Sequence, residues 1–131
     1  MSLSPWPNFS YQELACKCGQ CSADSGRQIS PELMSQVQIL RDSCGFPFEI
    51  SSAYRCQNHP AEARKSTPGS HNKGLAVDIL VNGYQAHHLL TEALKLGTFT
   101  GIGISQKGDY HRRFIHLDIS RAGNRPWVWS Y

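Results

Sequence analysis

Residues 70–80 read SHNKGLAVDIL and residues 114–119 read FIHLDI. Together the two stretches supply two imidazoles and a carboxylate, the ligand set that a catalytic zinc ion uses when one coordination position stays open for water. His71 follows Pro-Gly-Ser and precedes Gly74, which predicts a loop, whereas residues 75–81 form an apolar run with the β-branched content of a buried strand. A ligand on this loop and a ligand on this strand can fold back onto one metal ion.

The second stretch alternates with a period of two. Phe114, His116 and Asp118 therefore share one face of a predicted strand, and three apolar residues share the other. Taken alone, His71 is better explained as a loop histidine and His116 as a hydrogen-bonded core histidine. As a set of three polar groups, a shared metal ion is the better explanation, because buried polar groups need partners.

The rest of the chain predicts an α+β domain with helices packed on a small antiparallel sheet. A serine N-cap, a proline at the first helical position and apolar residues at helical spacing predict a helix that ends at Gly45. Trp127 and Trp129 are expected to cover a small apolar core, and stacking on sugar rings is the alternative. The predicted helices are 11–15, 31–44 and 84–96, and the predicted strands are 46–54, 75–81, 100–105 and 114–119; 57–70 is predicted to be a polar loop with at most one helical turn.

Three segments of the sequence resemble a known family. They are residues 70–78, close to Ser-x-His-x-x-Gly-x-Ala-x-Asp, residues 114–118, which read aromatic-Ile-His-x-Asp, and residues 52–55, which read Ser-Ala-Tyr-Arg. This set is similar to the zinc D-alanyl-D-alanine carboxypeptidases and the related phage L-alanyl-D-glutamate endopeptidases, which share a fold with the Hedgehog signalling domain. The resemblance spans about residues 8–120 and implies that fold.

The resemblance also implies roles for individual residues. Zinc (Zn²⁺) would be bound by His71, Asp78 and His116. Arg55, in the position of the family's substrate-binding arginine, would bind a substrate carboxylate or the developing oxyanion with its fork of donors.

The general base is less well defined by the resemblance. In the carboxypeptidase branch a further histidine lies five positions before the last ligand, which here is His111; the other branch has a glutamate three positions before that ligand, where this chain has Arg113. Asp109, on the same loop, is the reserve candidate for the base. Asp118 follows His116 by two residues and either orients the imidazole of that ligand or is a solvated surface group.

The function implied by the resemblance is zinc-dependent hydrolysis of peptide bonds in peptidoglycan stem peptides, as a D,D-carboxypeptidase or an endopeptidase. The alternative is a non-catalytic, zinc-containing module of the same fold that binds cell wall, such as a phage tail component. His111 favours the enzyme, because a purely structural site closes its fourth coordination position with protein and needs no base.

Length and charge limit the other possibilities. A chain of 131 residues fits one domain, residues 1–131, which would begin with an irregular arm over residues 1–29. The net charge of +3 comes from scattered Lys and Arg, which argues against a nucleic-acid surface but suits an anionic polymer. We expect a monomer without membrane insertion. No secretory signal is seen, so we expect cytoplasmic synthesis and action at the bacterial cell wall, in the periplasm or after delivery by lysis or a virion.

The chain has five cysteines: Cys16, Cys18, Cys21, Cys44 and Cys56. An odd number argues against a closed disulfide framework. A structural zinc could use the first three with Cys56 or His59. Because the paired C-x-x-C knuckles of a zinc ribbon are absent, we instead expect reduced thiols, or one disulfide from this cluster to Cys56 outside the cell.

Overall fold

The computed structural model describes residues 4–65 and 69–131, and in these residues five strands form one sheet in the order β1-β2-β4-β3-β5. The strands are β1 (Glu49–Ser52), β2 (Ala76–Leu80), β3 (Gly101–Ser105), β4 (Phe114–Asp118) and β5 (Trp127–Ser130). The helices are α1 (Tyr11–Leu14), α2 (Pro31–Cys44), α3 (Pro60–Ala63) and α4 (Gly83–Leu96), with the 3-10 turns η1 (Ala23–Gln28) and η2 (Tyr110–Arg112).

The α+β class predicted from the sequence is confirmed, with one addition to the sheet. Strands β1 to β4 pair antiparallel, as expected, whereas β5 runs parallel to β3 and was not predicted as a strand. The prediction that both C-terminal tryptophans cover a core is wrong for Trp127, which is 51% exposed. A parallel pairing at the sheet edge leaves this side chain in solvent.

Helix α2 begins and ends as its sequence predicts. The Ser30 hydroxyl accepts a hydrogen bond from the Leu33 amide, and Pro31 occupies the first turn, where its missing N–H costs nothing. Gly45 ends the helix in the left-handed conformation, with φ +75°. Buried apolar side chains along α2 pack against the sheet and α4: Leu33, Met34, Val37, Leu40 and Cys44.

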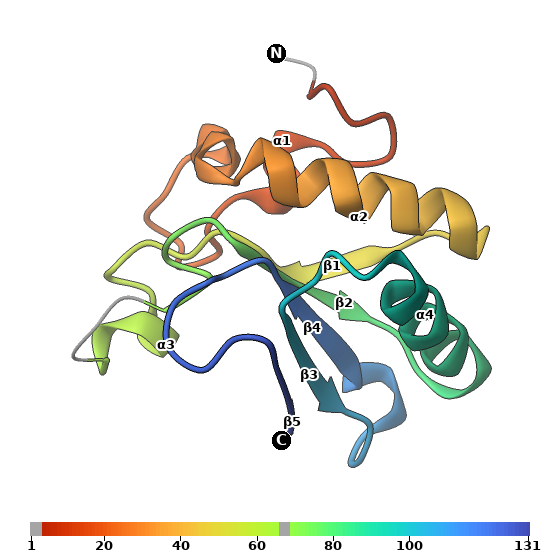
Figure 1. Ribbon diagram of the computed structural model, residues 1–131. Coiled ribbons are helices and arrows are strands. Elements are labelled where there is room, and N and C mark those ends of the chain that lie inside the picture. The colour runs from red at the N-terminus through yellow and green to blue at the C-terminus, as the bar shows by residue number, and fades with distance from the viewer. Residues whose placement is uncertain (1–3, 66–68) are drawn as a thin grey trace.

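The sheet separates an apolar core from a polar face. In β2 and β4, Val77 pairs with Leu117 and Ile79 with Ile115, and all four side chains lie in the hydrophobic core. Helices α2 and α4 lie on this side of the sheet, whereas α3 and the loop leading to β5 lie on the other (Figure 1). Residues that alternate with the core positions therefore face α3 and the C-terminal segment.

The N-terminal arm contributes to the core rather than lying loosely outside it. Ser10 and Glu13 form a reciprocal capping box at α1, and Leu14 and Phe9 are almost completely buried. The Leu14 carbonyl accepts a hydrogen bond from the Tyr54 amide at 3.2 Å. This contact holds the arm against the segment that leaves β1.

Strand β3 carries glycine at two of the three positions that face the polar side of the sheet; Ser105 is the third. A Cβ atom at Gly101 would collide with the Asp118 carboxylate, and one at Gly103 would lie 2.6 Å from the indole nitrogen of Trp129. The intervening Ile102 is buried in the core. The two glycines therefore make room for side chains that β4 and β5 place over this strand.

Candidate metal centre

Three predicted ligands meet on the polar face of the sheet. His71 lies in the turn before β2, Asp78 lies in the middle of β2, and His116 is the residue directly opposite Asp78 in β4. The turn docks on the start of α2, where the Ser30 amide donates to the Gly74 carbonyl at 2.8 Å. Gly74 has φ +73°, and a Cβ atom there would collide with the Gln28 carbonyl, so this turn needs glycine.

The imidazoles of His71 and His116 converge on the Asp78 carboxylate. Asp78 Oδ1 lies 3.2 Å from His71 Nε2 and 3.0 Å from His116 Nδ1, and the three ligand atoms lie within 4.8 Å of one another. Each residue is only 4–5% exposed. The centre is thus a compact, buried set of two nitrogen donors and one oxygen donor.

The remaining ring nitrogens fix how the imidazoles present their lone pairs. His71 Nδ1 lies 2.7 Å from the Ala53 carbonyl oxygen, and His116 Nε2 lies 2.7 Å from Asp118 Oδ2. Because each acceptor requires an N–H, the tautomers assigned from these bonds leave His71 Nε2 and His116 Nδ1 as acceptors. Both then point at a carboxylate oxygen, an arrangement of lone pairs that a bound metal ion or an added proton would satisfy. This donor set fits zinc.

The electrostatics of the site follow from the same contacts. Burial alone would raise the pKa of Asp78, but the neighbouring imidazoles of His116 and His71 outweigh it and hold the pKa well below its usual range. Burial would lower the pKa of His116, but its hydrogen bonds to Asp118 and Asp78 raise it above its usual value. Positive charge is therefore favoured between these groups.

Asp118 supports His116 and is not a solvated surface group, because its side chain is completely buried. Arg125 grips it with a fork, from Nε to Oδ1 at 3.1 Å and from Nη2 to Oδ2 at 2.8 Å. Burial would raise the pKa of Asp118, but His116 and Arg125 lower it to about 2. The carboxylate thus stays ionised and able to accept the N–H of His116.

Trp129 covers His116 from the edge of the sheet. Its ring centre lies 5.0 Å from that of His116, and the Arg125 guanidinium lies 5.0 Å from the centre of the indole. The sequence suggested neither the contact of Trp129 with His116 nor that of Arg125 with Trp129. The alternation of glycine and isoleucine in residues 101–104 is the signal that one face of this strand receives side chains from its neighbours.

Arg55, the residue that the resemblance assigns to substrate binding, contacts Asp78. Its Nη2 lies 3.4 Å from Asp78 Oδ2, its Nε donates to the Ser52 hydroxyl at 2.8 Å, and its Nη1 lies 3.5 Å from Glu62 Oε2. Its side chain is 17% exposed. The guanidinium is therefore held in one place, while part of the side chain stays exposed to solvent.

Glu62 is a buried member of this network that the sequence did not reveal. It lies in α3, within the stretch predicted as a polar loop, and Lys65 Nζ contacts its carboxylate at 2.9 Å. Burial alone would raise the pKa of Glu62, but Lys65 and Arg55 hold it below its usual value. Nothing in the local pattern marks this glutamate, because its partner Arg55 comes from another segment.

The structure does not bring the candidate bases into contact with the three ligands. His111 and Asp109 belong to the exposed turn η2, where Asp109 Oδ1 accepts from the His111 amide at 3.0 Å. Within residues 4–65 and 69–131, the His111 imidazole makes no hydrogen bond to His71, Asp78 or His116. The role of His111 therefore remains a prediction.

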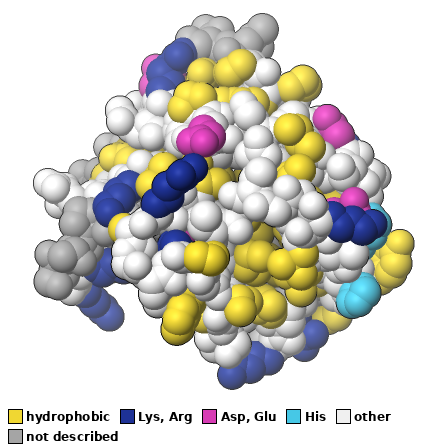
Figure 2. Space-filling model, viewed as in Figure 1, with side chains coloured by type: hydrophobic (Ala, Val, Ile, Leu, Met, Phe, Trp, Pro, Cys, Tyr) yellow, Lys and Arg dark blue, Asp and Glu magenta, His cyan; other side chains and the backbone are white. Residues whose placement is uncertain are grey.

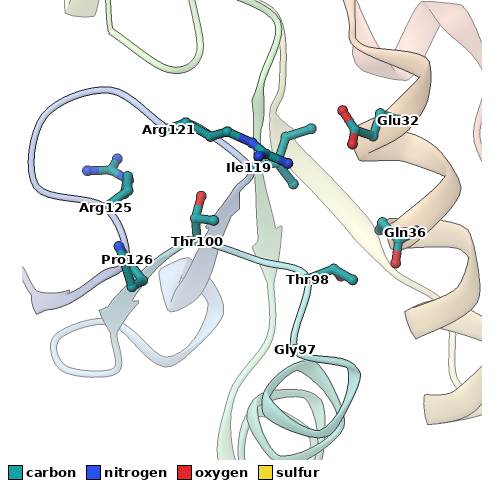
Figure 3. Close-up of a pocket in the computed structure, with 9 residues that line it drawn as sticks. All are labelled: Glu32, Gln36, Gly97, Thr98, Thr100, Ile119, Arg121, Arg125 and Pro126. Carbon is teal, nitrogen blue, oxygen red and sulfur yellow. The ribbon is translucent and has the colours of Figure 1, made fainter.

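Two cavities lie beside the centre without including its three ligands. One, of about 470 Å³, separates Glu32 and Gln36 of α2 from Arg125 and Pro126 (Figure 3). The other, of about 540 Å³, lies between the two loops 69–73 and 120–125. Arg125 lines both cavities and also donates to the Asp118 carboxylate. It therefore links both cavities to the carboxylate that holds the His116 imidazole.

The surface in Figure 2 shows Lys and Arg in several separate places, and hydrophobic side chains gathered around the lower centre of that face. The C-terminal segment exposes large apolar side chains: Trp127, Val128 and Tyr131.

No helix in the described part of the chain is long and apolar enough to cross a bilayer.

Comparison with known proteins gives a family. The family model described as Peptidase M15 matches residues 7–118, which contain all three candidate ligands. Comparison with curated proteins gave no match. The family match, together with the donor set described above, supports a zinc-dependent peptidase.

Proposed function

The chain belongs to the peptidase M15 family, and on that premise we propose that it hydrolyses peptide bonds in the stem peptides of peptidoglycan, with zinc held by His71, Asp78 and His116. The observation that carries this proposal is the convergence of two imidazole lone pairs on one buried carboxylate oxygen. When bound, zinc lowers the pKa of a coordinated water towards about 7 and polarises a carbonyl group.

The residues around the ligands keep them in register. Ala53 and Asp118 hold the two imidazoles in fixed tautomers, and Arg125 keeps Asp118 ionised. Trp129 shields His116 from water on one side. These supports reduce the reorganisation that binding and chemistry would otherwise require.

Arg55 is the proposed binding residue for the substrate. Its contacts with Asp78 and Glu62 fix the guanidinium beside the candidate ligands, and its remaining N–H groups can donate to a substrate carboxylate or to the developing oxyanion. Lys73 and Arg125 line the cavity between the loops 69–73 and 120–125, which suits the acidic groups of a stem peptide.

His111 is the proposed general base, with Asp109 in reserve. A neutral imidazole can take a proton from water and return it to the leaving amine. Asp109 fixes the backbone of the turn that carries His111. Catalytic hydrogen bonds often form only in the complex with substrate, so the exposed position of His111 is compatible with this role.

Purified stem peptides, incubated with the protein and analysed by mass spectrometry, test the proposal. Loss of a terminal D-alanine would identify a carboxypeptidase, and an internal cut would identify an endopeptidase. We expect activity to disappear with a chelator, to return with zinc, and to be lost in His71→Ala but kept in the matched control His87→Ala, an exposed histidine on α4.

Two results would contradict the proposal in different ways. Activity that survives both the chelator and His71→Ala would exclude zinc hydrolysis at this centre. Binding of zinc and of cell-wall peptides without any cleavage would instead identify a non-catalytic module. We further propose that the protein acts at the bacterial cell wall, where peptidoglycan is found.

A further inference from the structure

A second group of metal-ligating side chains lies apart from the His71, Asp78 and His116 centre. The sulfur atoms of four cysteines lie within 4.8 Å of one another: Cys16, Cys18, Cys21 and Cys56. Cys18 Sγ lies 3.6 Å from Cys21 Sγ and 3.7 Å from Cys56 Sγ. Cys16 is buried and the other three are half-buried.

These separations match the edges of a zinc–thiolate tetrahedron. With a Zn–S distance of about 2.3 Å, the sulfur atoms of a regular tetrahedron lie about 3.8 Å apart. A disulfide requires about 2.05 Å, little more than half of the separations seen here. We propose that Cys16, Cys18, Cys21 and Cys56 bind a second, structural zinc ion.

The backbone around the cluster is arranged to stabilise thiolates. The Gln20 amide donates to Cys18 Sγ at 3.4 Å, and the Cys56 amide donates to Cys16 Sγ at 3.3 Å. Gly19, with φ +88°, allows the tight turn between Cys18 and Cys21. Such N–H donors favour the charged form of sulfur, which is the form that binds metal.

The fourth ligand explains why the sequence argued against this site. A zinc ribbon takes its four ligands from two C-x-x-C motifs. Here three cysteines lie close together in the sequence and the fourth, Cys56, is a single cysteine in the segment after β1. His59, the other candidate, instead uses Nδ1 to accept from the Ala61 amide at 3.1 Å and caps α3. Four protein ligands leave no open position, so the ion would be structural rather than catalytic.

The position of the cluster gives it a consequence for the proposed peptidase. Cys56 is the neighbour of Arg55, whose guanidinium contacts Asp78. A metal ion that joins Cys56 to the arm at Cys16, Cys18 and Cys21 would hold this arginine in place. This second step, unlike the metal site itself, rests on the proposed function.

Metal analysis of the wild-type protein, purified under reducing conditions, is the first test. We expect two zinc ions per chain. After replacement by cobalt, thiolate-to-cobalt charge-transfer absorption should appear together with the bands of tetrahedral cobalt. One ion per chain without that absorption would overturn the proposal, as would a chain mass lower by two or four hydrogens with the cluster cysteines joined in disulfides.

Variants then assign each ion to its ligands. Cys18→Ser should lose one ion and the charge-transfer absorption, Cys56→His should keep both ions with altered absorption, and Cys44→Ala, outside the cluster, should match wild type. His71→Ala should lose the other ion and keep the absorption. If His71→Ala removes all the metal, or Cys18→Ser removes none, the four-cysteine site is wrong.

The wild-type cobalt spectrum decides the question if the cysteine variants fail to fold. For the link to Arg55, kcat/KM of Cys56→His should stay close to wild type, whereas that of Cys18→Ser should fall with the ion at His71, Asp78 and His116 still bound. Unchanged kcat/KM in a Cys18→Ser protein that has lost the second ion would refute that link and leave the metal site standing.

Discussion

Asp118→Asn tests whether the support of His116 controls metal binding. The carboxylate accepts four hydrogen bonds: from His116 Nε2, from Arg125 Nε and Nη2, and from the Ser120 amide. Asparagine keeps one oxygen and replaces the other with an NH₂ group that only donates, so either His116 or Arg125 would then face another donor. We expect zinc affinity to fall by roughly 10- to 100-fold, which is about 1.4–2.7 kcal/mol.

The same substitution should destabilise the metal-free fold. The Asp118 side chain is completely buried, and that of Arg125 is 17% exposed. Breaking a buried ion pair costs about 3–5 kcal/mol, and the oxygen that asparagine retains places the expected loss near the lower end, at about 3 kcal/mol. The native structure should survive with weaker binding of metal.

Competition with a chromophoric chelator measures the zinc affinity, and urea denaturation with a strong chelator present measures the free energy of unfolding. Asp42→Asn is the matched control, because this exposed carboxylate accepts, among the residues that the structure describes, a side-chain hydrogen bond from Gln38 alone, on the same helix. Zinc affinity in Asp118→Asn equal to that of Asp42→Asn would show that the bond from His116 to Asp118 does not orient the ligand.

Four further outcomes are expected. Because His116 and Arg125 depress the pKa of Asp118 to about 2, against an ordinary value of about 4, its ionised form stabilises the fold above about pH 4, and this contribution is lost as the pH falls towards 2. Urea denaturation of the metal-free protein should therefore show a smaller loss of unfolding free energy over that pH range in Asp118→Asn than in wild type. Equal losses in the two proteins would contradict this account of Asp118. Arg55→Lys should raise KM more than it lowers kcat, because lysine keeps the positive charge but loses the paired N–H donors of the guanidinium. Steady-state kinetics on stem peptides measures both constants, and a change in kcat alone would contradict this role. His111→Ala should lower kcat by roughly 10²–10⁴-fold with zinc retained, whereas full activity would exclude His111 as the base. Gly103→Ala should cost about 1–3 kcal/mol by displacing Trp129, and in a double-mutant cycle with Trp129→Ala, additive costs would refute the predicted clash.

The convergence of His71, Asp78 and His116 was predictable because its signal in the sequence is local. Alternation in residues 114–118 put His116 and Asp118 on one face, and the glycine-bounded turn put His71 before the strand of Asp78. The pairing of Asp78 with His116 then brought the residues together, as antiparallel strands with these patterns require.

The support around the ligands was harder to predict because it depends on distant partners. Arg125 and Glu62 have the sequence context of surface residues, and only the fold places them against Asp118 and Arg55. Strand β5 was missed because its aromatic residues fit a core cover equally well, and its parallel pairing with β3 has no local turn to announce it.

The alternation of β4 has a consequence for how this protein can change over evolution. Its odd-numbered residues, Ile115 and Leu117, belong to the core, and two of its three even-numbered residues, His116 and Asp118, belong to the candidate metal centre. Apolar exchanges of similar volume at the odd positions should be tolerated with chemistry intact, whereas even conservative changes at the even positions should alter chemistry in a folded protein. The five-residue strand β4 is thus under two nearly independent sets of selective constraints. A map of tolerated substitutions should alternate from one residue to the next between Ile115 and Asp118.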